Sequence, residues 1–236
     1  MPVTSTAAGT PSLTNQARRR QIIQAAIAVI AENGYAGASF ARIAEHAQLS
    51  STRLISYHFS GKADLMTAVV SDVLGSIGAH VGDIVSNRET SAGRLSGYIE
   101  GVVGFVDSHR VEMIALTEVM FGAGFEEGFR ADDAATGHLE SILIRGQQLG
   151  EFRSFDAAVM AAVVQRSVDG LPFALRADPS MDCGHYAREL VTLFELATRV
   201  APAPGVAPAR GAGTVAETGT PTGTGTGTAA TAAAGR

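Results

Sequence analysis

The sequence predicts an all-α protein in which a small three-helix unit at the amino end precedes a larger helical domain. Apolar residues recur at helical spacing between residues 14 and 200, and no convincing strand-turn-strand pattern intervenes. Glycine, proline and asparagine divide this stretch into short helices near the amino end and longer helices after them. We therefore expect two helical domains, at residues 14–61 and 62–200.

The two ends of the chain have a different composition. Residues 1–13 are mostly Thr, Ser, Ala, Gly and Pro without periodicity, and residues 201–236 are dominated by Pro, Gly, Ala and Thr. Such segments bury too little apolar surface to offset the conformational entropy lost on folding. We expect a disordered arm at residues 1–13 and a disordered tail at residues 201–236.

The amino-terminal unit is predicted to contain three helices. The first begins near Thr14 or Asn15, carries an apolar stripe from Ile22 to Ile30 and stops at Asn33-Gly34. The second runs from a cap at Ser39 to about Ala47. The third is capped by Ser50 or Ser51 and ends near His58. The apolar residues behind the second and third helices predict a small core, which comprises Ile43, Ala44, Ala47, Leu49, Leu54, Ile55 and Phe59.

The larger domain is predicted to begin with a long helix that starts near Lys62 and carries apolar residues from Leu65 to Ile77 at helical recurrence. This helix would link the two domains. Five further helix patterns follow, at about Ala92–Ser108, Val111–Phe121, Asp132–Leu149, Phe155–Arg176 and Asp182–Val200.

Glycines recur on one face of two of these helices, at 75, 78 and 82 and again at 97, 101 and 104. Each interior glycine costs a helix about 1 kcal/mol relative to alanine. In one interpretation these glycine faces allow a neighbouring helix to approach closely or form a flexible hinge. In the other they reflect only a composition that tolerates glycine. The sequence leaves both interpretations open.

Charge is distributed unevenly along the chain. The whole chain carries a formal charge of −5, whereas residues 14–65 contain six basic and three acidic residues, a net of +3, which leaves −8 for the remainder. An acidic body behind a basic amino-terminal unit discourages indiscriminate coating of nucleic acid while leaving one surface that can bind it.

Several classes of protein are disfavoured by the sequence. Cys183 is the only cysteine, so no intrachain disulfide or cysteine-rich metal site can form. No signal-peptide pattern and no run of about 18 apolar residues is present, which favours a cytoplasmic protein without a membrane partner. A serine nucleophile elbow and a phosphate-binding loop are also missing, and His109-x-x-Glu112 is too common to indicate a metal. We expect no enzyme activity, no cofactor and no metal.

The third predicted helix has the residues of a helix that reads DNA. The amino end of a recognition helix needs small or hydrogen-bonding side chains because it enters the major groove, and Ser51, Thr52 and Arg53 meet this requirement. The Arg53 guanidinium can bond both major-groove acceptors of guanine. Together with the helix before it, this segment predicts a helix-turn-helix domain that binds double-stranded DNA.

Other polar residues of this unit are candidates for phosphate contacts, which fix register but carry no sequence information. They are Ser39, Arg42, Ser56, Tyr57, His58 and Lys62. Lys62 opens a helix whose backbone N–H groups also attract a phosphate. The structural alternatives are that Ser39 and Ser50 cap helices, that Tyr57 packs as well as bonds, and that His58 is structural.

A longer pattern strengthens this interpretation. Residues 20–69 have an apolar first helix ending in Asn33-Gly34-Tyr35, a Ser39-Phe40 entry, Ile43-Ala44, the triplet at 57–59, and Gly61-Lys62 followed by Asp64-Leu65. In this order the segment resembles the N-terminal domain of TetR-family transcriptional regulators. The resemblance implies an all-helical homodimer with a variable C-terminal ligand-binding domain, which represses transcription from a palindromic operator until a small molecule releases it.

The segment departs from the family pattern at two places. The spacing from Ile43 to Phe59 is one residue longer than the commonest form, which leaves open whether Ser50 or Ser51 begins the recognition helix. Where many relatives have a phosphate-binding tyrosine, this chain has Ser56, with Tyr57 beside it.

The resemblance also implies roles for the larger domain. A small apolar or amphipathic effector would bind among central apolar residues that have a few polar neighbours. The candidates are Phe105, Met113, Leu116, Thr117, Met120, Phe121, His138 and Ile142, although ordinary core packing explains each of them as well. In relatives the last two long helices form the homodimer interface, here at Phe155–Arg176 and Asp182–Val200. The alternative is a helical small-molecule binding protein or enzyme whose amino-terminal unit is only structural.

Overall fold

The computed structural model describes residues 13–123 and 126–200, with only the backbone described at residues 123 and 126–133. These residues form helices and no strand, so the predicted all-α class is confirmed; their one β-type pairing is an isolated bridge between Phe152 and Arg199. The predicted tail and all of the predicted arm except Leu13 lie outside the described residues. Leu13 is the first residue of the first helix.

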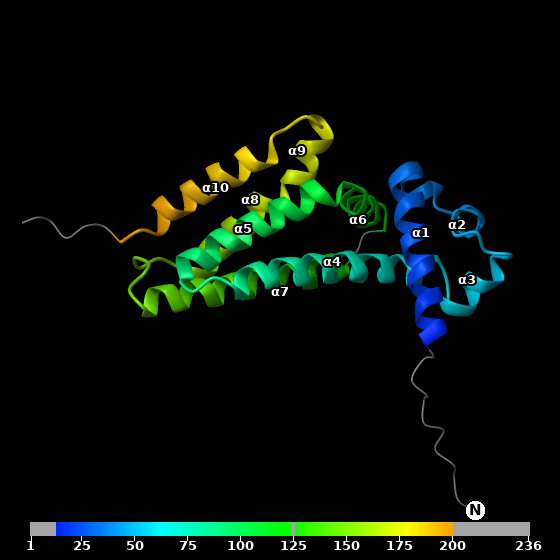
Figure 1. The fold of residues 1–236 in the computed structure, drawn as a ribbon, viewed down its shortest axis with the longest axis horizontal. Coiled ribbons are helices and arrows are strands. Elements are labelled where there is room, and N and C mark those ends of the chain that lie inside the picture. The colour runs from blue at the N-terminus through cyan, green and yellow to red at the C-terminus, as the bar shows by residue number, and fades with distance from the viewer. Residues whose placement is uncertain (1–12, 124–125, 201–236) are drawn as a thin grey trace, which may run out of the picture. The chain divides into compact units, whose positions relative to one another are not determined.

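The amino-terminal part contains α1 (Leu13–Gly37), α2 (Phe40–His46) and α3 (Arg53–His58) (Figure 1). In α1 the predicted apolar stripe from Ile22 to Ile30 is buried. The predicted stop at Asn33-Gly34 corresponds to a kink, because Gly34 has φ 70°, a left-handed conformation that favours glycine. Ser39 caps α2 as predicted, since its hydroxyl accepts a hydrogen bond from the backbone N–H of Arg42 at 3.4 Å.

The start of α3 differs from the prediction. Neither Ser50 nor Ser51 is the cap residue: α3 begins at Arg53 and its cap position is Thr52, which makes no side-chain capping bond. The Ser51 hydroxyl instead accepts from the backbone N–H of Arg53 at 3.1 Å, which closes a tight turn before the helix. Because Ser51 stabilises this turn and does not cap the helix, α3 begins later in the sequence than a cap at Ser50 or Ser51 predicts.

The larger part contains seven helices in the described residues. Their bounds are α4 Lys62–Ser86, α5 Ser91–Ser108, α6 Arg110–Ala123, α7 Glu126–Gln148, α8 Ala157–Asp169, α9 Leu171–Ala177 and α10 Cys183–Thr198. The predicted helix at Asp132–Leu149 begins six residues earlier, at Glu126. The predicted single helix at Phe155–Arg176 is wrong: Gly170 and Pro172 divide it into α8 and α9. Proline is accepted at the start of α9, where its missing N–H is not needed.

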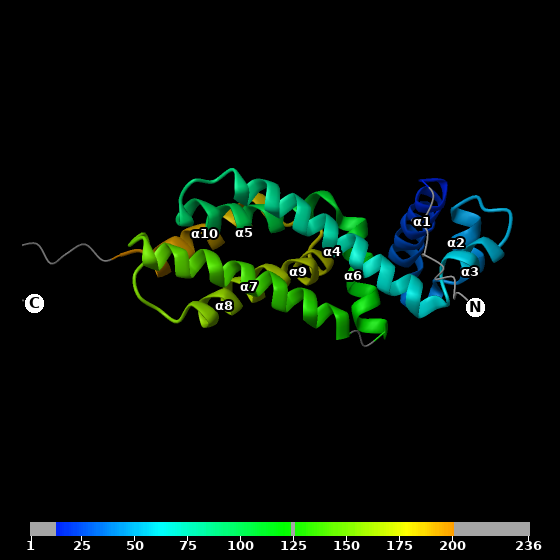
Figure 2. The same cartoon turned by 90° about the horizontal axis from the view of Figure 1, so that it is seen from below.

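Helix α5 lies between α4 and α10, and α7 packs against α8 (Figures 1 and 2). Of the two glycine series, only part of the second permits close packing. Gly97 and Gly101 of α5 are buried against Val81 and Ile84 of α4. At Gly75, Gly78, Gly82 and Gly104 no atom lies within 4 Å of the position that a β-carbon would take. Close packing of a second helix of this chain therefore does not explain these four glycines.

Two stretches, Lys62–Ser86 and Ala157–Ala177, are long and apolar enough to cross a membrane by length and composition. The same criterion selects core helices. In α4 the apolar residues Leu65, Met66, Val69, Val70 and Val73 are all buried in the core. These five residues of α4 are therefore used for packing within the chain.

Gly146 offers a test of the packing around α7. A side-chain carbon at this buried position would overlap the ring of Phe152, which is itself buried. We expect Gly146→Ala to lower the free energy of unfolding by about 1–3 kcal/mol because the ring must move. The matched control, Gly78→Ala on the open face of α4, should raise it by up to about 1 kcal/mol. Urea unfolding of both variants measures this, and equal stability of the two would contradict the packing described.

Candidate DNA interface

Helix α3 presents polar side chains on its outer side. Ser51, Thr52, Arg53, Ser56 and Tyr57 are all exposed. Tyr57 is 75% exposed, so this ring does not belong to the core. The inner side of the same helix is apolar, because Ile55 and the following Phe59 are buried together with Ile43, Ala44 and Ala47 of the α2 segment. The arrangement leaves a rigid helix with its hydrogen-bonding groups facing outward.

The two candidate residues near the start of α2 are also exposed. The Arg42 guanidinium donates a hydrogen bond to the carbonyl of Gly37 at 2.8 Å, which fixes the turn between α1 and α2. Ser39 lies at the first position before that helix. Backbone N–H groups at such a helix start are an attractive site for a phosphate. Ser39 and Arg42 thus flank the same end of α2.

Lys62 makes two contacts that sequence reasoning did not identify. Its Nζ donates to the backbone carbonyl of Tyr35 at 2.7 Å and lies 4.4 Å from the centroid of the Tyr35 ring. The lysine is half-buried and ties the start of α4 to the end of α1. Because an ammonium has three donors, a phosphate contact is still chemically possible beside the bond to Tyr35.

Tyr35 is also linked to the larger part of the chain. Its backbone N–H donates to a carboxylate oxygen of Glu118 in α6 at 3.4 Å, and Glu118 forms an ion pair with Arg176 of α9 at 3.1 Å. The three residues are separated by 83 and 58 positions in sequence, so local patterns gave no signal for this linkage. It connects α9 and α6 to the end of the helix that supports α3.

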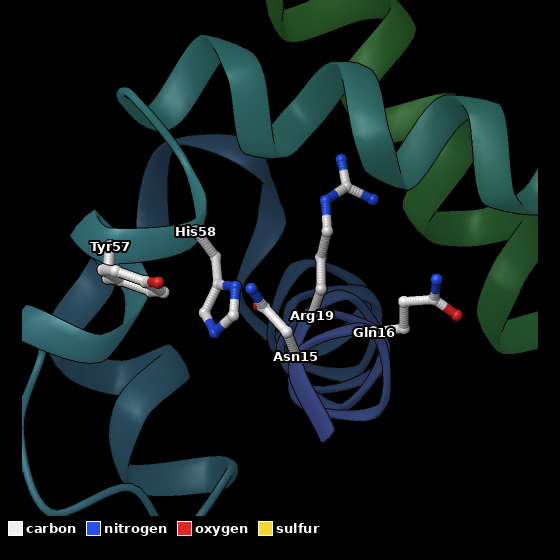
Figure 3. Close-up of a pocket in the computed structure, with 5 residues that line it drawn as sticks. All are labelled: Asn15, Gln16, Arg19, Tyr57 and His58. Atoms are coloured by element: carbon white, nitrogen blue, oxygen red, sulfur yellow. The ribbon is translucent and has the colours of Figure 1, made fainter. Parts of the chain in front are cut away.

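A notch of about 400 Å³ lies where the amino end of α1 meets the carboxyl end of α3. It is lined by Asn15, Gln16, Arg19, Tyr57 and His58 (Figure 3). The pKa of His58 is lowered from its usual value, first by partial burial and then by the positive charges of Arg19 and Arg18. Sequence reasoning included Tyr57 and His58 but missed the three α1 residues; the run of arginines at 18–20 was the available signal.

The predicted effector residues are divided between the core and the surface. Phe105, Met113, Leu116 and Ile142 are buried in the core, Thr117 is half-buried, and Met120, Phe121 and His138 are exposed. None of these eight residues lines the notch between α1 and α3, or a second cavity between α1 and α4 that Arg19 also borders. Their role in ligand binding therefore stays a prediction, as do the predicted DNA contacts.

Sequence reasoning also missed the buried polar pair of the larger part. The Tyr98 hydroxyl donates to the side-chain carbonyl oxygen of Gln165 at 2.6 Å, and the Gln165 amide nitrogen donates to Asp169 at 2.8 Å. Tyr98 and Gln165 are 5% and 7% exposed, so the pair is satisfied inside the core between α5 and α8. No helical periodicity indicates such a pairing.

Known proteins share this domain and this fold. Residues 22–69 match the family described as bacterial regulatory proteins, tetR family. A tetR-family regulatory protein from Rhodococcus RHA1 has 19% sequence identity and a TM-score of 0.66, with 78% of this chain and 98% of that one covered. The regulator FadR from Bacillus subtilis, solved in complex with stearoyl-CoA, has 21% identity and a TM-score of 0.66, with 74% and 96% covered.

A third solved structure is AibR in complex with isovaleryl coenzyme A and operator DNA, with 19% identity, a TM-score of 0.64, and 75% and 97% of the two chains covered. No curated protein sequence matches the chain. Residues 22–69 thus match the amino-terminal domain of the tetR family, and the described part of the chain has the fold of TetR-family transcriptional regulators.

The contacts of Lys62 lead to a stability prediction. Lys62→Met keeps the aliphatic stem but removes the hydrogen bond to Tyr35 and the charge above its ring, so we expect unfolding to become easier by about 1–2 kcal/mol. Lys62→Arg, which retains a cation, serves as the control and should lose less. Chemical denaturation gives both values. A methionine variant as stable as the unmodified chain would show that the contacts between Lys62 and Tyr35 contribute nothing to stability.

Proposed function

We propose that this protein is a ligand-responsive transcriptional regulator that represses transcription by binding a palindromic operator as a homodimer in the cytoplasm. The observation that carries the proposal is α3, whose exposed Ser51, Thr52 and Arg53 stand at the start of a short helix held by a buried apolar layer. A helix of this kind inserts its amino end into the major groove. The match of residues 22–69 to the tetR family supports the same function.

Two kinds of contact to the operator are proposed, one to a base and the others to the sugar-phosphate backbone. Arg53 would read a guanine through its two major-groove acceptors. Ser39, Arg42, Ser56, Tyr57, His58 and Lys62 would hold the sugar-phosphate backbone. Contacts of the second kind raise affinity for every sequence and make it depend on salt.

A homodimer is supported by an apolar surface on α8 and α10. Val159 and Val163 are one turn apart on α8 and are 59% and 50% exposed, and Leu193 and Leu196 of α10 are 55% and 56% exposed. The two helices are neighbours, since the Tyr186 hydroxyl of α10 donates to the carbonyl of Ser167 of α8 at 2.7 Å. Pairing this surface with its own copy buries it and places two α3 helices on one duplex.

As the effector we propose an amphipathic acyl thioester. FadR and AibR, which share the fold, were solved with stearoyl-CoA and isovaleryl coenzyme A. We propose that such a molecule enters among the predicted effector residues, of which Phe105, Met113, Leu116 and Ile142 supply the apolar surface. Displacing these side chains would shift α6, whose Glu118 contacts Tyr35 of α1. Release of DNA would follow through that linkage.

The alternative, a small-molecule binding protein or enzyme with a structural amino-terminal unit, predicts no specific DNA binding. The two functions are separated by measuring the affinity of the full chain for duplexes from the flanks of its own gene at about 50–200 mM salt. The proposed regulator should lose affinity steeply as salt rises and should lose it again on addition of stearoyl-CoA or isovaleryl-CoA. A log-log salt slope near zero would exclude the phosphate contacts that the proposal requires.

Arg53 provides the test of sequence reading. Arg53→Ala should weaken binding to the selected duplex by about 1–3 kcal/mol and relax base preference at one position of each half-site. Random-sequence DNA of equal length should be bound almost as before, because phosphate contacts remain. Equal losses on both duplexes would refute base reading by this residue.

The apolar surface provides the test of assembly. A charge at Leu196 cannot be buried against a second copy, so Leu196→Glu should shift the protein from dimer to monomer and weaken operator binding. Ile114→Glu, at a site on α6 that is 46% exposed, is the matched control and should remain dimeric. Light scattering measures both masses. A dimeric Leu196→Glu protein would place the interface elsewhere.

A further inference from the structure

The notch between α1 and α3 combines groups that favour an anion. In Figure 3, Asn15 points toward His58, whereas the side chain of Arg19, one turn further along α1, borders the notch and extends toward α4. Tyr57 borders the notch and its ring contacts His58 edge-on at 5.1 Å between centroids. Two hydrogen-bond donors, a cation and a titratable imidazole are therefore gathered at one place on the surface.

Arg19 is exposed, and its guanidinium packs over a ring of the core. Its guanidinium carbon lies 4.8 Å from the centroid of the Phe59 ring, which is itself buried. On the other side of Arg19 is a second cavity that is bordered by Asp64 and Asp72 of α4. The acidic residues thus lie on the α4 side of Arg19, and the notch on the α3 side is bordered by neutral and basic groups only. An anion would be attracted to the notch and repelled from the second cavity.

The electrostatic state of His58 supports the same conclusion. Partial burial together with Arg19 and Arg18 makes protonation of His58 unfavourable, which lowers its pKa. Two cations that raise the cost of a third positive charge attract a negative one equally well. After burial, the largest influence on the pKa of His58 is thus the positive charge of Arg19 and Arg18, which favours an anion at the notch.

The notch also lies where a duplex would place a phosphate. It adjoins the carboxyl end of α3, at Tyr57 and His58, whereas the candidate base-reading residue Arg53 begins that helix. A helix whose amino end enters the groove has its other end near the sugar-phosphate strand at the groove edge. Because α1 borders the same notch, a phosphate held there would also lie beside α1.

We propose that this notch binds one backbone phosphate of the operator in each half-site, through Arg19 and Asn15 of α1 together with His58 of α3. The inference rests on the proposed function and extends it, because it adds a contact from α1 to the predicted contacts of α2, α3 and α4. Arg19 supplies the charge, Asn15 donates through its amide, and His58 becomes a second cation when the phosphate is bound.

The test uses the full-length protein and the shortest flanking duplex that it binds. Arg19→Gln should weaken binding about tenfold per half-site, the loss expected for one charge-assisted hydrogen bond, and should reduce the salt slope by about one per half-site. Arg20→Gln is the matched control: it makes the same charge change one residue away, at an exposed site that does not line the notch. It should change affinity by less than about twofold and leave the slope unchanged.

A second measurement locates the phosphate. Single backbone phosphates of the duplex are replaced in turn by neutral methylphosphonates. One replacement at the flank of each half-site should weaken binding of the unmodified protein but have little further effect on Arg19→Gln, whose contact is already lost. Asn15→Ala should show the same coupling to the same position, which guards against a folding defect peculiar to Arg19→Gln.

The pH dependence tests the part played by His58. A bound phosphate favours the protonated imidazole, so binding takes up a proton and should strengthen as pH falls from about 8 to about 6. His58→Gln should flatten this dependence. If no duplex is bound by the unmodified protein, the proposed function and the notch site fall together. If the unmodified protein binds with a steep salt slope and Arg19→Gln matches Arg20→Gln, only the notch site is overturned.

Discussion

The burial of α1 is the interaction on which the rest of the structure depends. Its apolar side, from Ile22 to Ile30, is almost completely excluded from solvent and packs against α2, α4 and α6. Burying five or six aliphatic side chains of this size provides about 1.5–3 kcal/mol each, more than any polar contact of this region. Helix α3 has no comparable core of its own, because among its residues only Ile55 is fully buried. The polar face of α3 is therefore oriented by a helix that also belongs to the larger part of the chain.

The polar contacts around the end of α1 link this helix to specific positions on the neighbouring helices. Arg176, Glu118, Tyr35 and Lys62 form a continuous series from α9 through α6 and α1 to α4. The Arg176–Glu118 pair has an exposed arginine, so its ionic energy is small. Its importance is geometric, since Glu118 accepts a bond from Tyr35 directly after the kink at Gly34. A shift of α6 thus acts on the residue whose carbonyl holds Lys62.

Much of the fold was predictable because helical periodicity is a local property. The apolar stripe of α1, the cap at Ser39 and the start of α4 at Lys62 were all found from neighbouring residues. The sequence predictions failed where the same sequence pattern is compatible with two local structures. Ser51 shapes a turn rather than capping α3, and an apolar run that continues through Gly170 is two helices instead of one.

The candidate site was only partly predictable. The polar face of α3 followed from its sequence, whereas Tyr35, Glu118 and Arg19 become significant only through residues distant in the chain. Periodicity also could not separate a ligand pocket from an ordinary core, because buried Phe105 and Leu116 satisfy both descriptions.

The central claim is that α3, held by α1, is the surface that meets DNA. Hydrogen–deuterium exchange of the full chain, alone and with a bound duplex from the flanks of its gene, tests it most directly. Protection on binding should be confined to the backbone at the amino end of α1, the starts of α2 and α4, the turn before α3, and α3 itself, with α5 and α7 unchanged. Protection on the larger helices with none at residues 51–58 would contradict it.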